Sequence, residues 1–107
     1  MDLKISYRHI ESTPSIEAKI REKAEKLKKY FHGRINVDWI CSVDGDAHHS
    51  EVTVRGDHFT YHASSAEDNL YKTIDGAMAK LKKQLDKKNT QVKEKIHRKG
   101  SNLEFDE

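Results

Sequence analysis

The stretch that decides the fold is AEDNLYKTIDGAMAKLKKQLDKK, residues 66–88. At about 100° per residue on a helix, its apolar side chains share one stripe roughly 100° wide. They are Leu70, Ile74, Ala77, Met78, Leu81 and Leu85. A helix with a single apolar stripe has to pack that stripe against another element. The segment is therefore predicted to be a long helix that covers one face of a sheet.

Charge is sorted by sign around the same helix. Nearly opposite the apolar stripe, with spacings of 4, 4, 3 and 4, stand Lys72, Gly76, Lys80, Lys83 and Lys87. The acids Asp68, Asp75 and Asp86 occupy a separate sector beside them. The four cations, here named the lysine row, repel one another along about 22 Å of helix. An anionic polymer would relieve that repulsion, so the row indicates nucleic-acid binding, with a solvated lysine-rich face as the alternative.

Another helix is predicted nearer the N-terminus. Thr13 suits the N-cap and Pro14 the first helical position, and an apolar side continues to Phe31. The helix is expected to end at His32-Gly33, where glycine accepts a left-handed conformation. One flank of this helix carries Lys19, Lys26 and Lys29. Placed beside the second helix, this flank would widen the lysine row into a patch.

Alternating apolar and polar residues predict four strands, at residues 3–8, 35–43, 51–55 and 58–63. Turn signals separate the last three, and a capping box at residues 65–68 opens the second helix. The order is β-α-β-β-β-α, with the first two strands parallel through a right-handed crossover and the other pairs antiparallel. Each element has one apolar face, so the prediction is an α+β fold in which a four-stranded sheet carries both helices on one face. A single domain is expected over residues 1–95, followed by a mobile tail at residues 96–107.

Composition narrows the classes of partner. The chain of 107 residues is 36% charged with a formal net charge of +2. Residues 66–100 nevertheless carry ten basic and five acidic side chains, which points to an anionic partner. No apolar run reaches the roughly 18 residues of a membrane span and no signal-peptide pattern opens the chain, so no membrane partner is expected. The single cysteine, Cys41, excludes an intrachain disulfide and fits a cytoplasmic location.

Side chains that could carry catalysis or bind a metal do not form a recognisable site. His58 and His62, on one predicted strand face, would lie about 13 Å apart, too far to share one ion. Cys41 has inward strand parity, which is typical of a small buried hydrophobe rather than a nucleophile. No glycine-rich phosphate loop is present. No enzyme activity, metal, cofactor or small-molecule substrate is therefore expected.

Particular stretches resemble a known family. They are IESTPSI at residues 10–16, KLKKYF at residues 26–31, and DNLYKTIDG at residues 68–76 followed by KLKKQL at residues 80–85. With the predicted element order, they resemble the short ribosome hibernation-promoting factors, a family that includes ribosome-associated inhibitor A. The resemblance covers residues 1–88. It implies a cytoplasmic bacterial protein without enzyme activity that binds the small ribosomal subunit near the decoding centre. There it would overlap messenger RNA and A- and P-site transfer RNA, and stop translation.

The resemblance also implies which side chains contact ribosomal RNA phosphates: Lys26, Lys29, Lys80, Lys83 and Lys87. Lys72 is added on the geometry of charge alone. The protein is expected to be a monomer away from the ribosome. The alternative function is a free double-stranded RNA-binding module, which has a similar helix-and-sheet plan but normally begins with a helix. The sequence leaves open whether the protein promotes or opposes ribosome pairing.

Overall fold

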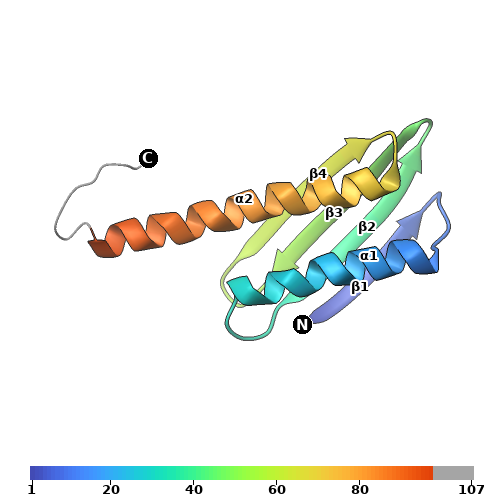
Figure 1. The fold of residues 1–107 in the computed structure, drawn as a ribbon. Helices are drawn as coiled ribbons and strands as arrows, with labels where there is room; N and C mark the ends of the chain where they lie inside the picture. The colour runs from blue at the N-terminus through green and yellow to red at the C-terminus, as the bar shows by residue number, and fades with distance from the viewer. Residues whose placement is uncertain (98–107) are drawn as a thin grey trace.

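The computed structural model describes the backbone of residues 1–97 and the side chains of residues 1–87. Its elements, drawn in Figure 1, are β1 (Asp2–Arg8), α1 (Pro14–Glu25), the 3₁₀ helix η1 (Lys26–Tyr30), β2 (Asn36–Asp44), β3 (Ala47–Arg55), β4 (Thr60–Glu67) and α2 (Leu70–His97). This is the predicted β-α-β-β-β-α order, with η1 continuing the first helix. None of the described helices has the length and hydropathy that a membrane span requires.

The four strands form one sheet in the order β1-β2-β3-β4. β1 and β2 run parallel, and the two remaining pairs are antiparallel. The register aligns one core residue of each strand in a row across the sheet: Ile5, Trp39, Val52 and Ala63. Both helices cover that face of the sheet (Figure 1). The predicted α+β fold, with two helices on one face of a four-stranded sheet, is confirmed.

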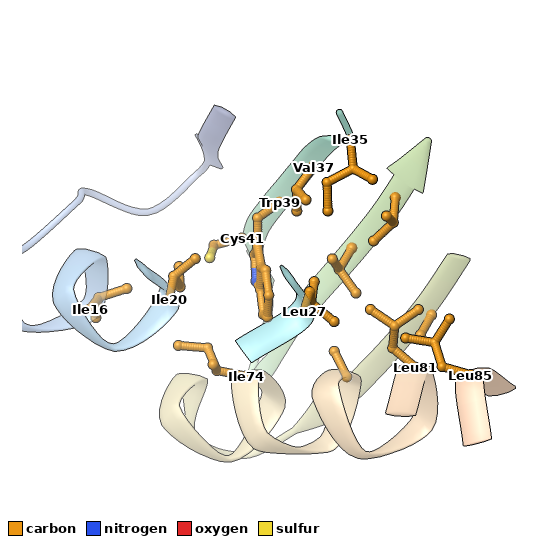
Figure 2. Close-up of a cluster of buried hydrophobic side chains, with 14 of the residues drawn as sticks. Ile16, Ile20, Leu27, Ile35, Val37, Trp39, Cys41, Ile74, Leu81 and Leu85 are labelled. Carbon is orange, nitrogen blue, oxygen red and sulfur yellow. The ribbon is translucent and has the colours of Figure 1, made fainter. Parts of the chain in front are cut away.

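The core lies between the sheet and the helices. Trp39 of β2 is fully buried and projects among side chains of α1, η1 and α2 (Figure 2). The predicted stripe of α2 is buried at Leu70, Ile74, Ala77, Leu81 and Leu85, and Met78 is half-buried against it. Burying each larger side chain of this kind stabilises a fold by about 1.5–3 kcal/mol. The stripe therefore holds α2 on the sheet.

The helix α1 begins as the sequence predicts and ends differently. Thr13 is the N-cap, and its Oγ1 accepts a hydrogen bond from the backbone N–H of Ile16 at 3.2 Å. The α-helical part ends at Glu25, and the chain continues as η1 to Tyr30. Gly33 has the left-handed φ of +91°, but it lies in the loop after η1. It therefore turns the chain toward β2 instead of capping the helix.

The predicted capping box at residues 65–68 is wrong. β4 continues through Glu67 and pairs Ser65 with Ser50 of β3. Ser65 faces the core and is 6% exposed. A small hydroxyl side chain suits a buried strand position as well as a helix N-cap, so the residue type does not distinguish the two positions. Asn69 acts as the N-cap of α2, since its Oδ1 accepts a hydrogen bond from the backbone N–H of Tyr71 at 2.8 Å.

Besides β4, two elements extend beyond their predicted ends by two residues or more. β3 begins at Ala47, four residues before the predicted strand at residues 51–55. α2 continues to His97, so residues 96 and 97, which the sequence places in the tail, are helical. The rest of the predicted tail lies outside the described residues.

Gly76 lets α2 approach β4 closely. A Cβ atom at this position would lie 2.3 Å from Ser65 Oγ and 3.0 Å from Ser65 Cβ. On the same side of the helix, Thr73 Oγ1 and Ser50 Oγ share a buried hydrogen bond of 2.8 Å. Gly76 is therefore a point of contact with the sheet, although its spacing places it among the lysines.

We expect Gly76→Ala to destabilise the protein. Alanine is favoured over glycine within a helix by about 1 kcal/mol, but overpacking a tight contact costs about 1–3 kcal/mol. The free energy of unfolding, measured with urea, should fall by a net amount of about 1 kcal/mol. Ser65→Ala/Gly76→Ala should recover part of the loss, because the closest contact is with the hydroxyl oxygen. A Gly76→Ala variant as stable as the original chain would contradict the close contact.

Candidate nucleic-acid interface

One lysine of the row, Lys80, lies on the β4 side of α2 and reaches back to the sheet, whereas the sequence places it nearly opposite the apolar stripe. Lys80 Nζ donates a hydrogen bond to the backbone carbonyl of Ser64 at 2.9 Å. Gln84 Nε2 donates to the backbone carbonyl of His62 at 2.8 Å. The reason is geometric: Lys80 lies only about 110° from the centre of the apolar stripe. Its long side chain can reach back to the sheet from there.

These two hydrogen bonds attach α2 to the edge of the sheet. β4 pairs with β3 on one side only, so the carbonyl groups on its other side lack a strand partner. Lys80 and Gln84 supply donors to two of those carbonyls. The position of the lysine row relative to the sheet is thereby fixed, which is what a preorganised binding surface requires.

The other lysines of the row point to solvent. Lys83 and Lys87 are exposed, and neither forms an ion pair with a residue among 1–87. Lys72 Nζ lies 3.2 Å from Asp68 Oδ1, and both side chains are mostly exposed. Such an exposed pair between residues four positions apart contributes little to stability, so Lys72 can exchange it for another anion. Three lysines of the row are thus available to a phosphate.

Lys82 belongs to the same surface, although the spacing of the lysine row does not include it. With Lys80 and Lys83 it lines a shallow hollow on the outer side of α2, which Ala79 and Asp86 complete. At about 100° per residue, Lys82 falls in the angular sector of the acids. The separation of basic and acidic sectors on the helix therefore does not identify Lys82. Its position within the KLKKQL stretch at residues 80–85 is the one sequence signal that includes it.

Lys26 and Lys29 lie on η1 and are exposed. Lys29 Nζ lies 5.5 Å from the ring centroid of Tyr30. Burial and the nearby charge of Asp86 raise the pKa of Tyr30, which places an acid of α2 beside η1. The acidic sector of α2 thus faces the first helix, and it separates Lys26 and Lys29 from the lysine row.

Asp75 occupies the groove between α1 and α2. Its Oδ1 lies 3.3 Å from Lys19 Nζ and 3.4 Å from Lys23 Nζ. Ser15 Oγ and Tyr71 Oη share a hydrogen bond of 2.7 Å, which joins the same two helices nearer their N-terminal ends. The expectation that Lys19 widens the lysine row is therefore wrong, because its ammonium group is turned toward Asp75.

The structure places two of the residues considered for metal binding or catalysis, His62 and Cys41. Among the side chains that the structure describes, no three His, Cys, Asp or Glu residues are grouped to hold a metal ion. His62 Nδ1 instead shares a hydrogen bond of 2.9 Å with Thr53 Oγ1. Cys41 is fully buried, and burial raises the pKa of its thiol to about 11, so the thiol is protonated at neutral pH.

The fold and this surface define a small α+β domain that presents cationic side chains from a helix fixed to a rigid sheet. This is the arrangement of proteins that bind a phosphate backbone. Residues 3–93 match the family described as "Sigma 54 modulation protein / S30EA ribosomal protein". The chain belongs to this family.

Several relatives of the chain are named as ribosome hibernation factors. The ribosome hibernation promoting factor of Escherichia coli (strain K12) is 30% identical over 94 residues, which cover 88% of this chain and 99% of that protein. The ribosome hibernation promotion factor of Bacillus subtilis (strain 168) is 27% identical over 104 residues, covering 94% of this chain and 55% of that protein. These relatives support a ribosome-associated role in translation hibernation.

Solved structures share the fold. A ribosomal subunit interface protein from Coxiella burnetii matches with a TM-score of 0.74 at 20% identity, covering 84% of this chain and 99% of that one. The N-terminal domain of Thermus thermophilus Protein Y also matches with a TM-score of 0.74, at 22% identity, covering 81% of this chain and 98% of that one. The arrangement of sheet and helices is therefore common to chains that differ at most positions.

Cys41 is expected to resist thiol reagents while the protein is folded. At pH 8 its raised pKa keeps the thiol protonated, and burial excludes the reagent. Mass spectrometry after iodoacetamide treatment should show unmodified folded protein and one added group per chain in urea. Rapid modification of the folded protein would show that Cys41 is accessible, contrary to its position in β2.

Proposed function

We propose that this protein binds the small ribosomal subunit near the decoding centre, blocks messenger RNA and A- and P-site transfer RNA, and so inhibits translation in resting or stressed cells. The observation that carries the proposal is the lysine row of α2, fixed to the sheet edge in a chain of this family. On this proposal the protein acts in the cytoplasm as a monomeric binding protein. It uses no cofactor and no small-molecule substrate.

Affinity comes from lysines on RNA phosphates. Lys83 and Lys87 need give up no ion pair within residues 1–87 before they meet a phosphate. Lys26 and Lys29 of η1 supply a second group of contacts, and Lys72 exchanges Asp68 for a phosphate. Each neutralised phosphate releases counterions, so affinity falls as salt rises.

Inhibition follows from rigid occupation of space. The helices and the sheet share one contiguous core, from Ile16 of α1 to Leu85 of α2. A domain held in this way keeps its shape when it binds. A rigid body that occupies the path of messenger and transfer RNA excludes them by steric overlap, and no chemical step is needed.

Sucrose-gradient sedimentation of purified ribosomes and small subunits with the protein tests the proposal. We expect comigration with small subunits and whole ribosomes at low salt, and release as salt rises. Protein bound beforehand should reduce the binding of messenger and transfer RNA to small subunits in a filter assay. Protein that stays at the top of the gradient yet binds a plain RNA duplex would indicate a free double-stranded RNA-binding module instead.

Lys83→Ala/Lys87→Ala is expected to weaken binding to small subunits without unfolding the protein. Losing two phosphate contacts should lower the slope of log affinity against log salt by about 1.5. Both side chains are exposed, so the thermal midpoint should change little. Fluorescence anisotropy across a salt series measures the slope, and differential scanning calorimetry measures the midpoint.

The matched control for this variant is Lys4→Ala/Arg8→Ala. It removes the same charge from β1, at the sheet edge opposite β4. This control should keep the original slope and affinity. Equal losses in the two double variants would show that net charge alone governs binding, and would contradict an interface on α2.

A further inference from the structure

One carboxylate turns two lysines away from solvent. Lys19 and Lys23 on α1 both contact Asp75 of α2, at 3.3 Å and 3.4 Å. Their side chains are 28% and 26% exposed, against 54% for Lys28 and 63% for Lys72, whose ion-pair partners lie three or four residues away in the sequence. The two ammonium groups are therefore folded into the groove between the helices.

The shared contact is more persistent than a single surface pair. An exposed ion pair contributes little on its own, because water and salt screen it. Here Asp75 lies between two ammonium groups, and separation from one leaves the other in contact. The neighbouring hydrogen bond between Ser15 and Tyr71 holds the same two helices together. Lys19 and Lys23 are thus kept near Asp75 by the packing of α1 on α2.

We propose that Asp75 determines specificity by withholding Lys19 and Lys23 from RNA phosphates. The inference rests on the proposed function, because it concerns which RNA the cationic surface accepts. Affinity for RNA of any sequence or shape rises with the number of phosphates that a protein neutralises. Two further free lysines would therefore strengthen binding to RNA of any shape. The small subunit, whose phosphates are proposed to meet the other lysines already, would gain less from them than an unmatched RNA.

Asp75 also acts directly against the wrong ligand. Its side chain is 54% exposed, so its carboxylate also faces a phosphate backbone that approaches between the helices, and it offsets the attraction of Lys19 and Lys23 for that backbone. Like charges placed together suppress mismatched partners in this way. The cationic surface is consequently confined to the outer side of α2 and to η1. Only an RNA whose phosphates match those two regions can use all the free lysines.

The test compares binding of a 20-base-pair RNA duplex and of small ribosomal subunits across a salt series. Asp75→Asn keeps the shape of the side chain and frees both lysines. For the duplex, the slope of log affinity against log salt should steepen by about 1.5. The preference for small subunits over the duplex should fall roughly tenfold. Glu51→Gln is the matched control, because it changes net charge equally at an exposed position of β3, on the sheet face away from the helices. It should leave the slope nearly unchanged.

A second pair of variants separates the freed lysines from the lost acid. Lys19→Gln/Lys23→Gln in the original chain should leave the slope for both ligands unchanged, because these lysines do not reach RNA. Adding the same two substitutions to Asp75→Asn should restore the original slope. Circular dichroism and thermal unfolding of each variant check that the helices remain folded.

Two results would overturn the inference. One is a slope for Asp75→Asn no steeper than that for Glu51→Gln. The other is a shallower slope for Lys19→Gln/Lys23→Gln, which would show that the two lysines already contact RNA. If the original chain fails to bind small subunits, the proposed function is refuted. The duplex measurements still decide the role of Asp75 in that case.

Discussion

The packing of α2 against β3 and β4 is the constraint on which the rest of the structure depends. Gly76 meets Ser65, Thr73 bonds to Ser50, and the apolar stripe fills the space above the sheet around Trp39. These contacts fix the rotation of α2 about its own axis. The orientation of each charged side chain on the helix is then fixed: some face the β4 edge, some face solvent and some face α1. None of these directions can change without unpacking the core.

That rotation gives the charges of α2 two different environments. On the outer side and the β4 side, the lysine row lies where a polymer can follow it along the helix. On the α1 side, Asp75 meets Lys19 and Lys23, and Asp86 lies near Tyr30. Cations are thus neutralised where the helices meet and left unneutralised on the outer side of α2. Solubility does not require this division, because alternating Glu and Lys residues support a helix equally well.

The sequence predicts the fold well, because periodicity reports burial directly. The direction of a charged side chain is a different matter, since it depends on neighbours that are distant in the chain. The two pairs that define the groove, Lys19–Asp75 and Ser15–Tyr71, each join residues 56 positions apart. Lys80 lies at the side of the helical wheel, and the wheel does not show that the edge of the sheet is within its reach. The site could therefore be predicted as a set of lysines on α2, but not as a surface.

Lys80 shows how one side chain can serve both the fold and a binding surface. An ammonium group has three N–H donors, and Lys80 gives one to the carbonyl of Ser64. This bond satisfies an unpaired acceptor on the edge strand and restricts the side chain to one region. Ordering a free lysine costs up to about 2 kcal/mol of rotamer entropy. Part of that cost is met when the protein folds, so Lys80 can offer its remaining donors to a phosphate with less entropy still to lose.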